Sequence, residues 1–153
     1  MAPALILAAC GITTSPLPVP DWPEDTDDPI RTSTAESELS LIARYNATIA
    51  VYPKLSAKLG PLRDQHAQHL VAMRGSPGNS EPEVSVSPGD RKSVIVATTA
   101  AAAIIALTIA ERVAAQQRAD ACGKAATQQL AWTLSLIGAC EAQHSAVLAS
   151  VKA

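Results

Sequence analysis

Residues 130–148 read LAWTLSLIGACEAQHSAVL, and the spacing of their apolar side chains decides the fold class. One helical face carries Leu130, Leu134, Ile137, Glu141, His144 and Leu148. Spacings of three and four residues are typical of an α-helix packed in a bundle, whereas strands alternate with a period of two. Hydrophobic residues make up 48% of the chain, aromatic residues only 3%, and Phe is absent. The core must consist mainly of Ala, Leu, Ile and Val, and Ala and Leu favour helices. The sequence therefore predicts an all-α domain.

Three further helices are expected upstream of this stretch. Ser33-Thr34-Ala35-Glu36 fits a capping box, so the first helix is expected to begin at Ser33 and to end near Tyr52. Its predicted buried face is Leu39, Ile42, Asn46 and Ile49. The second helix is expected to reach Met73, with the face Leu55, Leu59, Leu62, His66, His69 and Met73. The third is expected over about 92–121 and to end at Gly123, and Thr127 is expected to cap the fourth.

The connection between the second and third helices indicates the topology. Residues 75–90 are rich in proline and glycine and are expected to form a loop within the helical domain 33–153. Fully extended, this loop could reach roughly 45 Å, and a bundle helix is only about 30 Å long. The third helix can therefore run parallel to the second, as in ferritin-like four-helix bundles, where a long crossover joins two helical hairpins. An ordinary hairpin array with a disordered loop remains the alternative.

The amino-terminal residues resemble part of an export signal. Leu7-Ala8-Ala9-Cys10 resembles the lipobox of bacterial lipoproteins, in which cleavage exposes a cysteine that carries the lipid. No Lys or Arg precedes Cys10 and the apolar run is short, so residues 1–10 are interpreted as part of a longer signal. Residues 11–32 are rich in proline and acidic side chains and are predicted to form a disordered tether. We expect a lipid anchor at Cys10 on the extracytoplasmic face of the cell membrane; an apolar terminus without such a role is the alternative.

Charge limits the classes of partner. The net charge of −2 gives no basic surface for nucleic acid, which excludes a nucleic-acid partner. Residues 93–110 contain no charged side chain, which raises the alternative of a single membrane span. A central helix that is buried on most sides of a bundle explains the same composition.

Ionisable residues occupy faces that should be apolar. His66 and His69 interrupt the second helix, Glu141 and His144 interrupt the fourth, and Glu111 extends the apolar face of the third. Buried ionisable groups are costly unless they are paired or bound to metal, so these side chains are expected to meet.

A local similarity refines this expectation. Arg63-Asp64-Gln65-His66 followed by Leu70 aligns with Glu141-Ala142-Gln143-His144 followed by Leu148. Two hairpins related by a pseudo-twofold axis would place His66 near His144 and an Arg63–Glu141 ion pair between them.

Glu141-Ala142-Gln143-His144 also resembles the Glu-x-x-His motif of carboxylate-bridged di-iron proteins. The resemblance implies that Glu141 and His144 are ligands, with Glu36 or Glu38 and Glu111 as further carboxylates. Arg63 stands where the first-half glutamate belongs, and an arginine cannot ligate iron. The chain is also similar to ferritin-like lipoproteins of actinobacteria that contain a domain of unknown function, through Leu-Arg-x-x-His-x-x-His-Leu and Ala-Cys-Glu-x-x-His. That family implies a fold and a location, but no activity.

The polar cluster has three interpretations. The first is a metal-free structural cluster that fixes helix register. The second is a mononuclear zinc, copper or iron site of His66, His69, Glu141 and His144, since such ions accept imidazole and carboxylate ligands. The third is a working di-iron oxidase or ferroxidase.

If Cys10 carries a lipid, Cys122 and Cys140 remain as an even pair in an oxidising compartment, which favours a disulfide. The two residues would lie roughly 20 Å apart along the hairpin, which opposes it; free thiols are the alternative.

The sequence shows no phosphate-binding loop, Cys-x-x-Cys pair or recognisable serine triad. The leading hypothesis is a non-catalytic envelope lipoprotein without a cofactor, whose helical surface binds another protein or stabilises an envelope assembly. A degenerate ferritin-like metal-binding protein and a membrane-spanning accessory subunit are the alternatives.

Overall fold

The computed structural model describes residues 26–74 and 94–151, and these form four α-helices and one short 3-10 helix. The helices are α1 (Asp28–Val51), α2 (Ser56–Arg74), α3 (Ala100–Cys122) and α4 (Gln128–Ala149), with η1 (Pro53–Leu55) in the turn before α2. Within the two described ranges there is no strand. The all-α prediction is confirmed for this part of the chain.

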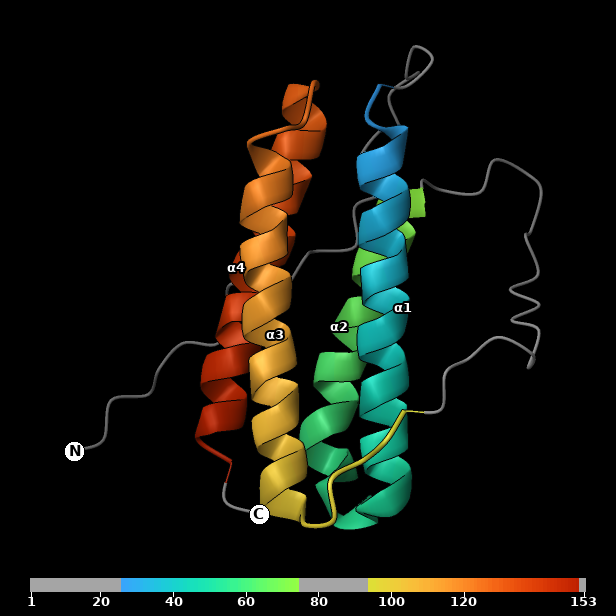
Figure 1. Cartoon of the computed structure of the whole chain (residues 1–153), viewed down its shortest axis with the longest axis vertical. Coiled ribbons are helices and arrows are strands. Elements are labelled where there is room, and N and C mark those ends of the chain that lie inside the picture. The colour runs from blue at the N-terminus through green and yellow to red at the C-terminus, as the bar shows by residue number, and fades with distance from the viewer. Residues whose placement is uncertain (1–25, 75–93, 152–153) are drawn as a thin grey trace.

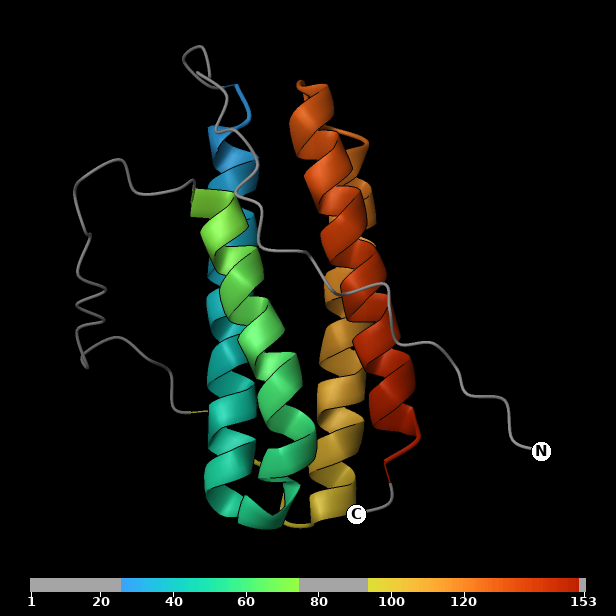
Figure 2. The ribbon, with the colours of Figure 1, turned by 180° about the vertical axis from the view of Figure 1, so that it is seen from behind.

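The four helices pair as two antiparallel hairpins (Figure 1). Most contacts of α1 are with α2, and most contacts of α3 are with α4. The hairpins meet through α1 against α3 and through α2 against α4. Seen from either side, α2 and α3 run in the same direction, so α2 ends at one end of the bundle and α3 begins at the other (Figure 2). The predicted parallel pair is confirmed, although the loop 75–90 itself lies outside the described residues.

Two apolar clusters fill the interior at different heights. The first cluster consists of Tyr45, Leu55, Leu59, Ile104, Leu107 and Leu148. The second consists of Ala35, Met73, Leu130, Leu134 and Ile137. Every helix supplies residues to this interior, and between the two clusters every helix also buries polar side chains. A layer rich in buried polar side chains thus lies between the two apolar clusters.

The first helix differs from its prediction at its start and on its buried face. It begins at Asp28 with Pro29 in its first turn, a position that proline favours. Ser33 lies inside the helix, where its hydroxyl donates to the carbonyl of Ile30, so the capping box and the boundary at residue 33 are wrong. The buried face consists of Thr34, Ala35, Glu38, Leu41, Tyr45 and Thr48, while the predicted Asn46 is exposed. The first part of the tether prediction and Cys10 lie in residues 1–25, outside the described residues.

Capping residues set the remaining boundaries of α3 and α4. The hydroxyl of Thr99 accepts a hydrogen bond from the amide of Ala102, so α3 begins at Ala100 rather than near residue 92. Gly123 ends α3, and Thr127 caps α4 through the amide of Leu130, as predicted. In the described part of the chain, no helix combines the length and apolar character needed to cross a membrane.

Asp27 joins the start of α1 to the turn between α3 and α4. Its carboxylate accepts hydrogen bonds from the amides of Ala126 and Thr127 at 2.7 and 3.0 Å, and from the Thr127 hydroxyl at 2.6 Å. The hydrogen bond from Thr127 contributes most to holding the pKa of Asp27 below its usual value. We expect Asp27→Ala to lower the melting temperature by several degrees, because three donors at the end of the other hairpin lose their acceptor. The matched control is Asp28→Ala, at an exposed carboxylate one residue away, and an equal effect of both changes would contradict the linking role.

Candidate metal centre

Seven ionisable side chains from all four helices form the polar layer between the two apolar clusters. They are Glu38 of α1, His66 and His69 of α2, Glu111 and Arg118 of α3, and Glu141 and His144 of α4. Each is 5% exposed or less. Helical periodicity explains their convergence, since residues three or seven positions apart share one face. The predicted meeting of His66, His69, Glu111, Glu141 and His144 is therefore found, and Glu38, not Glu36, is the carboxylate from α1.

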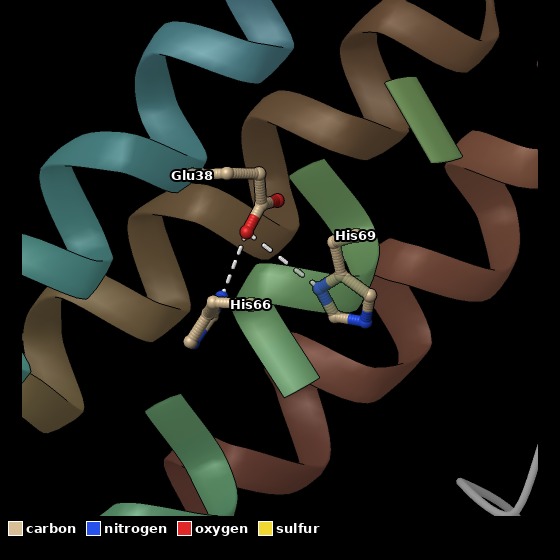
Figure 3. Close-up of side chains that lie close together, drawn as sticks. All are labelled: Glu38, His66 and His69. Carbon is tan, nitrogen blue, oxygen red and sulfur yellow. Dashed lines mark hydrogen bonds and ion pairs between the residues drawn. The ribbon is translucent and has the colours of Figure 1, made fainter. Parts of the chain in front are cut away.

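The first half of the layer is centred on Glu38 (Figure 3). Its Oε2 lies 2.8 Å from Nδ1 of His66 and 3.6 Å from Nδ1 of His69. The first distance is a hydrogen bond, whereas the second is too long for one, and Nδ1 of His69 has no hydrogen-bond partner. Three potential metal-binding atoms of α1 and α2 thus face one another within 4.8 Å.

The second half is centred on Glu111. Its Oε1 lies 2.8 Å from Nε2 of His66 and 3.5 Å from Nδ1 of His144, and it accepts a 2.5 Å hydrogen bond from the Tyr45 hydroxyl. Nδ1 of His144 and Oε2 of Glu111 have no hydrogen-bond partner. The imidazole of His66 therefore stands between two carboxylates, with one ring nitrogen directed to each.

Arg118 connects the two halves. Its Nη2 lies 3.3 Å from Oε1 of Glu38 and 3.3 Å from Oε1 of Glu141, and it donates to the Ser37 hydroxyl at 2.8 Å. The backbone of α4 lies close to this arginine, because a Cβ added to Gly138 would lie only 3.0 Å from Cβ of Arg118. The absence of a side chain at Gly138 thus lets α3 and α4 approach at the level of the guanidinium.

The predicted ion pair between Arg63 and Glu141 is wrong. Arg63 is half-exposed and binds Asp64 of its own helix, with a further contact to Asn46 of α1. Arg118, which the sequence did not single out, pairs with Glu141 instead. The guanidinium of Arg63 can stay hydrated at the surface of α2, so burying it in the core would cost desolvation free energy without need.

The contacts reveal an internal twofold symmetry that differs from the predicted register. Tyr45 follows Glu38 by one heptad and donates to Glu111, while Arg118 follows Glu111 by one heptad and donates to Glu38. The buried faces of α2 and α4 match at one constant offset, which pairs His66 with Glu141 and His69 with His144. His66 and His144 are neighbours, with ring centroids 5.0 Å apart, but they are not symmetry equivalents.

The ionisation of the layer follows from these contacts. Burial works to lower the pKa of His66, but its hydrogen bonds to Glu111 and Glu38 outweigh burial and raise that pKa to about 9. Burial works to raise the pKa of both carboxyls, but contacts with the histidines lower it, to about 2 for Glu111. At neutral pH both carboxylates are charged, and His66 and Arg118 balance them.

The pKa of Glu141 is shifted in the opposite direction from the pKa values of Glu38 and Glu111. Burial raises the pKa of Glu141 to about 8; the positive charge of Arg118 acts in the opposite direction, and the nearby Glu38 and Glu111 add to the rise. Neither carboxyl oxygen has a hydrogen-bond partner within the described residues. Burying an unsatisfied carboxyl is unfavourable, so this side chain is poised to accept a cation.

Of the two alternatives for Cys122 and Cys140, the structure shows free thiols and no disulfide between them. Cys122 at the end of α3 contacts Ser135 in the first half of α4. Cys140 lies deeper in the bundle, 3.5 Å from Nε2 of His144 and 3.7 Å from Oε1 of Gln65. The two cysteines occupy different levels of the hairpin, as the opposing geometric argument indicated.

A groove of about 850 Å³ lies between α1 and α3 and extends past the level of the polar layer. It is lined by Ser37, Leu41, Ala114 and Arg118 among others, but by none of the buried histidines or their partner carboxylates. Of the seven residues of the polar layer, Arg118 alone lines this groove.

Comparison with protein-family models, with curated proteins and with solved structures finds no match for this chain.

Proposed function

We propose that this chain is a metal-binding helical bundle that holds a divalent transition-metal ion in its polar layer. The observation that carries the proposal is the set of inward-facing donor atoms without hydrogen bonds: Nδ1 of His69 and His144, Oε2 of Glu111 and both carboxyl oxygens of Glu141. Folded proteins rarely leave so many buried polar atoms unsatisfied at one place. A metal ion bound beside Glu111 would satisfy several of these atoms at once, since His66, Glu111 and His144 each offer a ligand atom within 4.8 Å of the others.

The order of the buried residues supports a ferritin-like fold. In carboxylate-bridged di-iron bundles, two helices each supply a glutamate and the other two each supply Glu-x-x-His. This chain has Glu38 on α1, His66-x-x-His69 on α2, Glu111 on α3 and Glu141-x-x-His144 on α4. The parallel course of α2 and α3 also fits such a bundle (Figure 1). The departure is His66, which occupies the place of a bridging glutamate.

The burial of the layer favours a structural role over catalysis. The histidines and glutamates of the layer are all buried, and none of them lines the groove between α1 and α3. Catalytic metal sites keep one position open to substrate or water, whereas structural sites are closed. We infer that the ion would hold the two hairpins together in one arrangement.

A second function, binding of a protein partner, is supported by one surface feature. Ile105, Ile109 and Val113 form a stripe on α3, and each is more than half exposed. Side chains of this size at helical spacing fit a docking helix or another apolar surface. Together with the lipobox at Cys10, this stripe supports the proposal of a lipid-anchored envelope protein that binds another protein.

Elemental analysis of the full chain, purified without a histidine tag or chelator, tests the metal-binding proposal. We expect about one equivalent of a transition metal or more, and its loss in His66→Ala and in Glu111→Gln. The matched control is Glu36→Gln, because Glu36 is an exposed glutamate of α1 and should not affect metal content. A folded, cooperatively melting chain that contains no metal, even after exposure to zinc or ferrous iron, would contradict the proposal.

A further inference from the structure

We propose that this centre holds a single ion, bound in the Glu111 half, and that the guanidinium of Arg118 takes the place of a second ion in the Glu38 half. The inference rests on the proposed function. It concerns the number and position of the ions, which ligand identity alone does not determine, because the layer offers two sets of three donors, Glu38–His66–His69 and His66–Glu111–His144, that share His66.

The Glu38 half already contains a cation. Nη2 of Arg118 lies 3.3 Å from Glu38 and 3.3 Å from Glu141, the two carboxyls that a second ion would share with His69. A divalent ion in that place would lie within a few ångströms of a fixed positive charge, in a region without solvent. Such repulsion is far stronger in the interior than in water.

Among residues 26–74 and 94–151, no arginine or lysine forms an ion pair with Glu111. The symmetry-related donor on that side is Tyr45, whose neutral hydroxyl hydrogen bonds to Glu111 without cancelling its charge. The difference between the two halves is therefore the difference between Tyr45 and Arg118 at equivalent positions. An incoming cation would therefore meet the guanidinium of Arg118 beside Glu38, but a neutral hydroxyl in the equivalent position beside Glu111.

The imidazole of His144 is oriented for the same half, and the imidazole of His66 can serve it. A neutral histidine has a lone pair on one ring nitrogen only. If Nδ1–H of His66 donates to Glu38, its Nε2 presents the lone pair toward Glu111. Nε2–H of His144 donates to Oε1 of Gln65, which leaves the lone pair of Nδ1 directed toward Glu111. Carboxylate and amide partners that fix a histidine in this way are typical of metal ligands.

The ligand chemistry indicates the class of ion. His66, His144 and Glu111 supply two imidazoles and a carboxylate, and Glu141 can add a second carboxylate. This set suits zinc or ferrous iron and is unlike the all-oxygen sites of calcium and magnesium. Glu38 and His69 would then lie outside the ligand sphere, as supports of His66 and partners of Arg118.

The test is the number of ions bound by the full chain after removal of metal with EDTA and dialysis against zinc or cobalt(II). We expect one ion in the unmodified chain and in Glu38→Gln, whose amide oxygen can still accept from His66. We expect none in Glu111→Gln. We expect two ions in Arg118→Gln, because the positive charge beside Glu38, His69 and Glu141 is removed and a second ion can take its place. We expect one ion in Arg118→Lys, because lysine keeps the positive charge.

Each result supports or overturns the inference. Two ions in the unmodified chain would overturn it, as would loss of the ion in Glu38→Gln with retention in Glu111→Gln. A single ion in an Arg118→Gln chain refolded in the presence of metal would also overturn it. The comparison of Glu38→Gln with Glu111→Gln decides the position of the ion even if Arg118→Gln does not fold. An unmodified chain without any ion would instead contradict the proposed function, a result distinct from binding of two ions.

Discussion

In the metal-free chain, Arg118→Leu is expected to reduce the free energy of unfolding by about 3–5 kcal/mol, the range typical for removal of one partner from a buried ion pair. Arg118 is 3% exposed and lies beside Glu38, which is fully buried and charged. Without the guanidinium, Glu38 keeps only its contacts with the histidines, and the layer acquires a net negative charge. Urea unfolding followed by circular dichroism measures the effect.

Two further variants separate the loss of charge balance from a change in packing. Arg112→Leu changes an exposed arginine of the same helix and is expected to alter stability by less than about 0.5 kcal/mol. Glu38→Gln removes the charge that Arg118 balances, so the double variant Arg118→Leu/Glu38→Gln should be more stable than Arg118→Leu alone. Equal effects of the Arg112 and Arg118 changes, or a double variant as unstable as the two losses combined, would contradict the assigned role of Arg118.

The helices with continuous apolar faces were predictable from sequence. The predicted buried faces of α2 and α4 agree with the structure, and only Leu62 of α2 is partly exposed. In α1, the buried face includes Thr34, Glu38 and Thr48, while Leu39 and Ile42 are only partly buried. Apolar periodicity therefore favoured a neighbouring face of α1, because half of the residues in its true face are polar.

The internal symmetry was present in the sequence but was predicted in the wrong register. A shared Gln-His pair aligned His66 with His144, a match that depends on very few residues. The longer comparison, between the whole apolar faces of α2 and α4, aligns His66 with Glu141. An alignment of two complete helix faces predicts the internal symmetry better than a match of two residues, since every residue of a buried face must pack against the same core.

Arg118 illustrates what the sequence could not reveal. An arginine in the polar second half of a helix is ordinarily solvated, and no local pattern distinguishes Arg118 from Arg112. Its burial depends on three distant features: the carboxyls of Glu38 and Glu141, and the close approach of α4 at Gly138. Only the spacing of one heptad from Glu111, shared by Tyr45 and Glu38, could have drawn attention to it.

The metal-free chain is expected to lose stability as the pH rises from about 5 to about 9. The folded pKa of Glu141 is about 8, above the ordinary 4.5, so its contribution to stability is complete below pH 4.5 and is lost as the pH rises to 8. The folded pKa of His66 is about 9, above the ordinary 6.5, so its contribution is lost between pH 6.5 and 9. Glu38 and Glu111 have lowered pKa values, and their contribution is lost only below pH 4.5. Stability should therefore be greatest near pH 5.

Since one pKa unit corresponds to about 1.4 kcal/mol and the two shifts together span about six units, the decline should amount to several kcal/mol, with about 8 kcal/mol as its upper limit. Urea unfolding at pH 5, 7 and 9 with EDTA present would measure it. In Glu141→Gln the part of the decline between pH 4.5 and 8 should disappear, while the part that belongs to His66 should remain between pH 6.5 and 9. Bound metal should reverse the trend, because the ion replaces protons on its ligands and binds more tightly as the pH rises. A metal-free chain with equal stability at the three pH values would show that Glu141 and His66 ionise in the folded chain as they do in water, and that the layer does not hold their protons.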